Sequence, residues 1–172
     1  MPTTRVARGW IVLVFTVLLG ALPPLATAGA TRVPIAVIVH PEVPVDELSL
    51  QELRQIFLGK RQFWTSRLPV TLLMPPRGSP EREILLGKIS EQHTEAQYQQ
   101  HWINKLFDDG APIAPKITGS NAMSASLARG IPGAIALVPA DKIPEGVKVL
   151  RIDGKQPGES GYPLVVQMTG GR

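Results

Sequence analysis

Residues 33–39 read Val-Pro-Ile-Ala-Val-Ile-Val, a nearly continuous apolar run with the length of one β-strand. A strand with one face in water alternates apolar and polar residues, whereas a strand covered on both faces is apolar throughout. This segment therefore predicts a strand that is buried on both sides of a sheet.

The segments that follow alternate between strand-like and helix-like patterns. Further apolar runs are expected to form strands at 70–74, near 113–117 and at 134–138, and a closing β pair at 147–152 and 164–168. Strands that alternate with helices are typical of α/β domains. The sequence therefore predicts a single compact α/β domain, with a mixed sheet flanked by helices.

Capping residues mark the helix starts. Ser49 and Glu52 form a capping box, and Ser79 followed by Pro80 is a second clear start. The expected helices run from Leu50 to a cap at Gly59, from Pro80 to about Ser90, from Thr94 past Leu106, and from the turn at 119–121 to Gly130.

Apolar residues recur at helical spacing on two of these helices. The first carries Leu50, Leu53 and Phe57 on one face, and the third carries Tyr98, Trp102 and Leu106. Such stripes belong to the core more often than to a ligand site, so we expect the aromatic side chains to be buried.

The amino-terminal segment has the order of a secretory signal peptide. Arg5 and Arg8 precede an apolar run at 10–22, which a Pro-Pro pair breaks ahead of Ala26-Thr27-Ala28. The run is shorter than the roughly 20 residues of a membrane-spanning helix. We therefore expect a signal peptide at 1–28, a domain at 29–172 and a periplasmic location, with an uncleaved anchor as the alternative.

Composition excludes two other classes of protein. Removal of the expected leader takes away Arg5 and Arg8 and no acidic residue, which lowers the formal charge from +4 to +2. This mild charge, without any Lys or Arg run, argues against a nucleic-acid binder. The sequence has no cysteine, so hydrophobic burial rather than a disulfide framework must stabilise the domain.

The sequence shows no constellation that would make it an enzyme. Its three histidines, His40, His93 and His101, lack the i, i+4 spacing of a two-histidine zinc helix. No nucleophile elbow, Walker loop or Rossmann glycine pattern is present. We therefore assign no catalytic residue, no metal and no cofactor.

One helix start has the features of an anion site. Arg77, Gly78 and Ser79 precede the helix at Pro80, and Arg82 follows one turn later. Helix amino termini attract anions through their N–H groups and macrodipole, and a hydroxyl and a guanidinium add directed donors. The alternative is that Ser79 only caps its own helix.

Five segments resemble, in the same order, those of the phosphate-binding proteins of phosphate ABC transporters. They are Ile56-Phe57-Leu58-Gly59-Lys60 with Trp64, Arg77-Gly78-Ser79, Pro132-Gly133-Ala134-Ile135 with Val138, Ile152-Asp153-Gly154 with Pro157, and Gly161-Tyr162-Pro163-Leu164. The resemblance implies a fold like one lobe of a type II periplasmic binding protein. That family buries phosphate between two lobes, and its members are about twice as long as this chain.

The resemblance also implies a ligand set and partners. Residue by residue it assigns phosphate contacts to Arg77, the backbone of Gly78 and Ser79, with Ser120 and Asn121 expected across the cleft. The implied function is binding of phosphate or a similar small oxyanion, in connection with a membrane transporter or a periplasmic partner protein.

Two residues depart from the family pattern beside this turn. Pro80 and Glu81 stand where the family has glycine and threonine. Proline has no N–H to donate, and Glu81 adds a negative charge where an anion would bind. The alternative function is therefore an interaction or sensory module that kept the scaffold and lost the ligand.

Processing of the leader is the first testable prediction. The mature protein should begin at Gly29 or, from a second Ala-x-Ala ending at Ala30, at Thr31, and it should be recovered from the periplasmic fraction. Intact-mass spectrometry checks this. A full-length mass in the membrane fraction would instead establish the uncleaved anchor.

Overall fold

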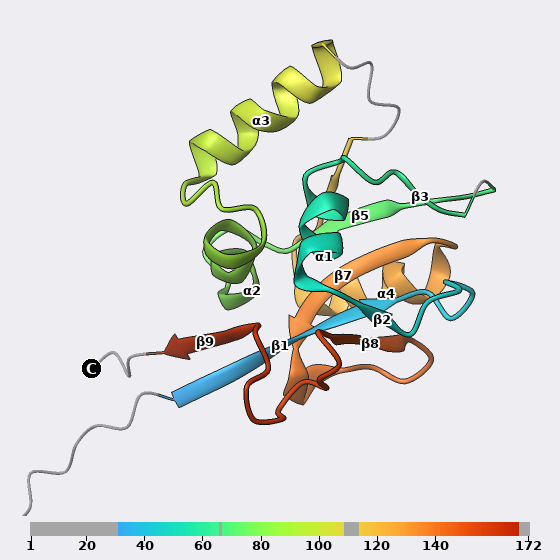
Figure 1. The fold of residues 1–172 in the computed structure, drawn as a ribbon, viewed down its shortest axis with the longest axis vertical. Helices are drawn as coiled ribbons and strands as arrows, with labels where there is room; N and C mark the ends of the chain where they lie inside the picture. Colours follow the sequence, from blue (N-terminus) through green and yellow to red (C-terminus); the bar gives the residue numbers. More distant parts are fainter. Residues whose placement is uncertain (1–30, 66, 109–113, 169–172) are drawn as a thin grey trace, which may run out of the picture.

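The computed structural model describes residues 31–65, 67–108 and 114–168, and its largest element is a seven-stranded mixed sheet (Figure 1). The strand order is β2-β8-β1-β7-β5-β6, and β9 pairs with β1 beside this path. The strands are β1 (Thr31–Val39), β2 (Glu47–Leu48), β5 (Thr71–Met74), β6 (Lys116–Ile117), β7 (Ala134–Pro139), β8 (Lys148–Ile152) and β9 (Val165–Met168). A separate two-stranded sheet holds β3 (Phe63–Thr65) and β4 (Leu68–Pro69).

The central strand of the sheet is β1, as its apolar sequence predicts. Residues 35–39 are fully buried and pair with β7, residues 37–39 also pair with β8, and residues 31–34 pair with β9. Successive side chains point to opposite faces, so Ile35 and Val37 enter the larger core cluster and Ala36 and Ile38 the smaller one.

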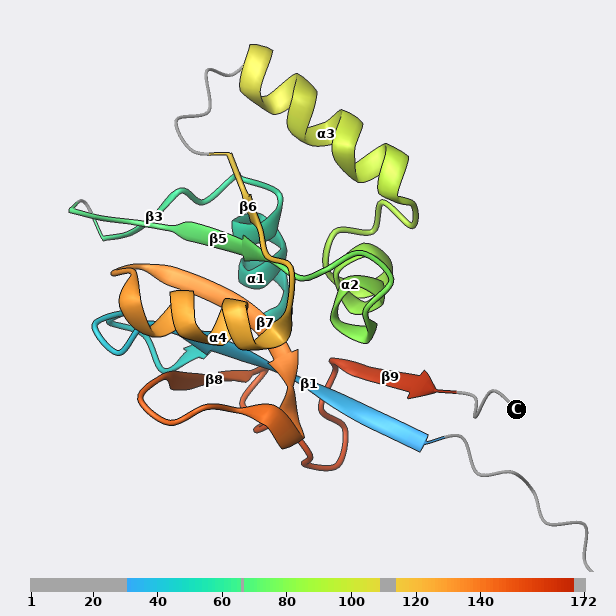
Figure 2. The ribbon, with the colours of Figure 1, turned by 180° about the vertical axis from the view of Figure 1, so that it is seen from behind.

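Helices cover both faces of the sheet. On one side lie α1 (Leu50–Phe57), α2 (Pro80–Ile84), which continues as a π-helical turn at Leu85–Ile89, and α3 (Glu95–Asp108). On the other side, turned toward the viewer in Figure 2, α4 (Asn121–Gly130) packs against β7 through the small residues Ala125 and Ala128. A short 3-10 helix at Ala140–Lys142 follows β7. The predicted fold class, an α/β domain with a flanked mixed sheet, is thus confirmed.

The helix starts follow the predicted caps. Ser49 and Glu52 form the complete capping box of α1, and Gly59 adopts the left-handed conformation with φ +68° after that helix. Ser79 caps α2, with Pro80 as its first helical residue. Local sequence therefore determines these boundaries.

Three sequence predictions need correction. The segments 148–152 and 165–168 are strands, but they do not pair with each other, because nine-residue β1 is long enough to bind both along its length. The strand expected near 113–117 is limited to Lys116–Ile117, with residue 113 outside the described residues. Tyr98 and Trp102 are buried, but Leu106 is 37% exposed, because α3 projects beyond the sheet (Figure 1).

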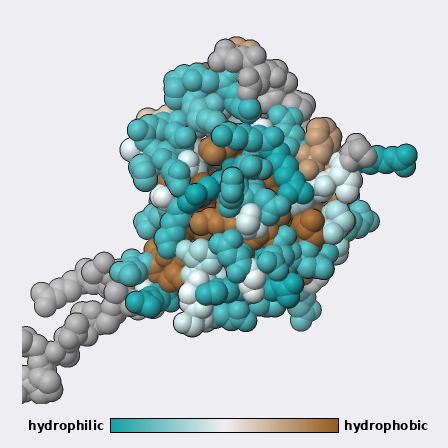
Figure 3. Space-filling model, in the orientation of Figure 1, coloured by the Kyte–Doolittle hydropathy of each residue, from teal (hydrophilic) through white to brown (hydrophobic). Residues whose placement is uncertain are grey.

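The surface reflects this arrangement. Apolar side chains show mainly in the middle of the molecule, whereas α3 presents mostly polar side chains in the same view (Figure 3). Within the described ranges, no helix combines the length and the apolar character that a bilayer crossing requires.

Truncation of Phe57 tests the packing of the core. Phe57 is fully buried, and its carbonyl oxygen accepts a 2.8 Å hydrogen bond from the Tyr98 hydroxyl. Phe57→Ala should lower the free energy of unfolding by about 3–5 kcal/mol in urea titrations. The matched control Phe107→Ala removes a side chain that is 84% exposed and should change it by less than about 0.5 kcal/mol. Equal losses for both variants would contradict this packing.

Candidate functional site

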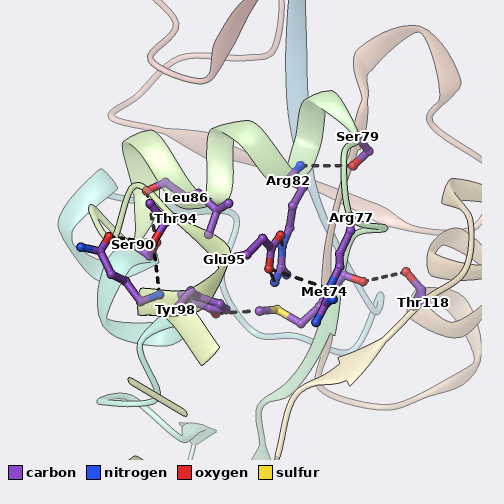
Figure 4. Close-up of polar contacts among 11 residues, drawn as sticks. Met74, Arg77, Ser79, Arg82, Leu86, Ser90, Thr94, Glu95, Tyr98 and Thr118 are labelled. Atoms are coloured by element: carbon purple, nitrogen blue, oxygen red, sulfur yellow. Dashed lines mark hydrogen bonds and ion pairs between the residues drawn. The ribbon is translucent and has the colours of Figure 1, made fainter. Parts of the chain in front are cut away.

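The predicted site residues lie at the edge where the parallel strands β5, β6 and β7 have their carboxyl ends. In open α/β sheets this edge is where ligands commonly bind. After Met74 the chain turns into α2, and after Ile117 it turns into α4. Thr118 holds the two turns together, since its hydroxyl donates to the Met74 carbonyl at 2.8 Å (Figure 4).

Ser79 and Ser120 are both helix caps. The Ser79 hydroxyl oxygen accepts from the Arg82 N–H at 3.2 Å, and the Ser120 hydroxyl oxygen accepts from the Met123 N–H at the same distance. Each hydroxyl keeps a proton that it can donate to a ligand. The capping role is thus observed for both serines and leaves a ligand contact open to each.

Asn121 and Glu81 join the starts of the two helices. The Asn121 side-chain amide donates to Glu81 Oε1 at 2.9 Å, and Glu81 is fully buried. The other oxygens of the pair, Glu81 Oε2 and Asn121 Oδ1, are buried without a hydrogen-bond partner in the described part of the chain. A carboxylate that belongs to the protein therefore lies where two helix amino termini favour negative charge.

Arg77 and Gly78 form the exposed side of the site. The Arg77 side chain is 59% exposed, and its Nε lies 4.0 Å from Glu95 Oε2. Gly78 adopts φ +74°, and a Cβ atom at that position would meet no other atom within 4 Å. The turn is therefore open to solvent, with a guanidinium beside it.

Arg82 points away from this turn into a partly buried ion pair, in which the Glu95 side chain is 33% exposed. Its Nε and Nη2 donate to the two carboxylate oxygens of Glu95 at 2.7 and 2.8 Å (Figure 4). This bidentate contact holds the pKa of Glu95 below its ordinary value, with Arg77 adding a smaller effect in the same direction, while burial acts against it. Arg82 also lies over the Tyr98 ring at 5.2 Å.

The sequence predicts five of the residues at this edge and the position of Glu81 beside them, but it does not predict two of the contacts made there. Arg77, Gly78, Ser79, Ser120 and Asn121 do lie at one edge of the sheet. The sequence does not indicate the partner of Asn121, because Glu81 lies 40 positions away along the chain. It does not indicate the ion pair of Glu95 with Arg82 either, because a single glutamate in the first turn of a helix does not reveal which arginine it contacts. Within the described ranges, no group of three metal-ligating residues is assembled.

The fold is similar to that of phosphate-transport binding proteins. No family model matches the sequence. A structure described as a putative phosphate ABC transporter substrate-binding protein of Clostridium perfringens, with bound phosphate, superposes with TM-score 0.65 at 18% identity, over 81% of this chain and 55% of the other. PstS of Borrelia burgdorferi gives 0.62 at 14%, over 79% and 55%. An ABC-type phosphate transport receptor of Vibrio cholerae gives 0.59 at 16%, over 80% and 55%.

These similarities confirm the fold that the sequence motifs imply. The chain spans about half the length of the solved structures it matches, which agrees with a single lobe of such a protein. The neighbours are binding proteins by description, and their identities of 14–18% establish the fold alone.

The ion pair of Glu95 predicts a pH dependence of stability. A carboxyl whose pKa is lowered by folding stabilises the fold above its unfolded pKa, ordinarily 4.5, and loses this contribution as the pH falls through the folded pKa. Glu95→Gln should therefore be less stable than wild type at neutral pH, and should lose less stability when acidified below about pH 4. Urea midpoints at several pH values measure both effects.

A surface glutamate provides the control for this prediction. Glu91 forms an exposed ion pair with Arg54 at 2.7 Å, and such pairs contribute about 0–1 kcal/mol. Glu91→Gln should therefore stay close to wild type at neutral pH. Parallel acid profiles of wild type and Glu95→Gln would contradict the contribution of the Glu95 pair.

Proposed function

We propose that this protein is a periplasmic binding protein that takes a small oxyanion such as phosphate at the joined starts of α2 and α4, in connection with an ABC transporter. It is a binding protein and not an enzyme. The observation that carries the proposal is the 2.9 Å hydrogen bond between Asn121 and Glu81, which brings the two helix starts together. The fold similarity to phosphate-transport proteins supports the same ligand class.

The contacts proposed for the anion come from both helix starts. Arg77 supplies an exposed guanidinium, Gly78 an open backbone turn and Ser79 a hydroxyl. Ser120 and Asn121 supply the opposite side. Charge-assisted hydrogen bonds of this kind are roughly twice as strong as neutral ones, and two helix amino termini add to the attraction.

Glu81 sets the strength of this binding. Its buried carboxylate repels an incoming anion and already compensates the helix amino termini. Pro80 contributes no N–H, so one donor of the helix start is absent. We therefore propose weak binding, limited by Glu81.

The second candidate function is an interaction module. It is favoured by large apolar side chains that remain exposed on α3 and β6: Ile103 at 47%, Leu106 at 37%, Phe107 at 84% and Ile117 at 66%. Exposed apolar patches of this kind commonly mark contacts with other molecules. In this function the scaffold would serve recognition of a periplasmic partner protein rather than transport of an anion.

Calorimetric titration with phosphate at low salt tests the proposed site. Glu81→Gln removes the repelling charge, keeps the side-chain length and adds an N–H donor, so phosphate affinity should rise roughly tenfold. Arg77→Ala should lower it about fivefold, a modest effect because this arginine is largely solvated.

The control is an arginine that carries the same charge elsewhere. Arg67→Ala, at an exposed residue directly before β4, should leave the affinity close to that of wild type. If wild type and Glu81→Gln both give no heat with phosphate and sulfate, oxyanion binding is refuted and the interaction module is preferred.

A further inference from the structure

We propose a second binding site, in the cleft between α3 and the β5–β6 edge, for a carboxylate group carried on an apolar chain. This cleft has a volume of about 150 Å³ and is lined by Arg82 and Trp102 together with Met74, Tyr98, Gln99 and Ile117. None of the five residues of the proposed oxyanion site lines it.

Two buried hydrogen-bond donors lack partners at this cleft. Arg82 is 5% exposed and Trp102 is 7% exposed, yet Arg82 Nη1 and Trp102 Nε1 have no acceptor among the described residues. Burial of a polar group without a partner is unfavourable, because its hydrogen bond to water is lost and not replaced. Both atoms are N–H donors, so a ligand that relieves this cost must present acceptor oxygens.

Neighbouring groups do not replace such a ligand. The Tyr98 hydroxyl donates to the Phe57 carbonyl at 2.8 Å and lies 3.8 Å from Met74 Sδ. Burial raises the pKa of Tyr98, and the nearby Trp102 indole N–H acts in the opposite direction, but that N–H is not aligned with any acceptor among the described residues. Nε and Nη2 of Arg82 both donate to Glu95, and Nη1 has no acceptor among the described residues.

The local charge selects a monoanion. Arg77 and Arg82 bring two positive charges to Glu95, which brings one negative charge (Figure 4). The net charge of this group is +1, which one carboxylate neutralises. A phosphate dianion would bring a second negative charge toward the Glu95 carboxylate, which repels it.

The rim of the cleft selects an apolar carrier. Gln99 and Trp102 line the cleft, and Ile103 and Leu106 lie four positions further along the same helix, hence one turn away on the same faces. Both are exposed, as is Ile117 across the cleft at 66%. An alkyl or aromatic chain attached to the bound carboxylate would cover these side chains.

The indole N–H resonance of Trp102 reports directly on this site. In ¹⁵N-labelled protein, hexanoate should shift this resonance saturably, whereas hexanamide, which lacks the charge, should not. The indole of Trp64 is an internal reference, because its N–H already donates to the Gly133 carbonyl at 2.8 Å. Trp102→Phe identifies the resonance, and it should weaken hexanoate binding about fivefold, measured calorimetrically, through loss of one hydrogen bond.

Two further experiments identify the source of the carboxylate and separate this cleft from the proposed oxyanion site. A short apolar peptide with a free carboxyl terminus, compared with its amidated form, shows whether a polypeptide supplies the group. Glu81→Gln should leave hexanoate binding unchanged, because Glu81 does not line this cleft. The hexanoate experiment can therefore succeed even if the phosphate titration fails. Equal shifts with hexanoate and hexanamide, no shift with either, or a larger shift with phosphate would overturn the proposal.

Discussion

The burial of β1 on both faces is the constraint on which the rest of the structure depends. Its residues 35–39 have no exposed surface and their side chains point alternately to the two faces, so the sheet must be covered on both faces. Ile35 and Val37 face the core beneath α1 and α2, whereas Ala36 faces α4 and, being small, allows that helix to approach closely. The same strand aligns β7, and through it β5 and β6, whose carboxyl ends then form one edge. The candidate site is a consequence of this alignment.

Near that edge, buried acceptor oxygens and buried N–H donors without hydrogen-bond partners lie in two different places. Among the described residues, the starts of α2 and α4 hold the unpaired acceptor oxygens of Glu81 and Asn121, whereas the cleft beneath α3 holds the unpaired donors of Arg82 and Trp102. The protein's own carboxylate thus occupies the position that attracts an anion, while the unpaired donors lie apart from it, Arg82 on α2 and Trp102 on α3. This separation accounts for both proposals: weak oxyanion binding limited by Glu81, and a distinct carboxylate site.

The sequence predicts the features that short-range physics determines. The two-sided burial of β1, the capping box at Ser49 and the Ser79-Pro80 start all depend on residues a few positions apart. Pairings between distant residues are not predictable in the same way. The apolar pattern of β8 and β9 identifies strands without identifying β1 as the partner of both, and the exposure of Leu106 depends on how far α3 extends past the sheet. The Glu81–Asn121 and Arg82–Glu95 contacts follow from the tertiary fold.

The proposed oxyanion site depends on Glu81 occupying the anion position at the joined helix starts. A crystal structure of the Glu81→Gln variant soaked in phosphate would show whether an anion takes that position. Tetrahedral density is expected in contact with Arg77, Ser79 and Asn121, with the glutamine amide turned toward it. Density only at a distance from Arg77 and Ser79, or no density at the helix starts, would contradict an anion site there.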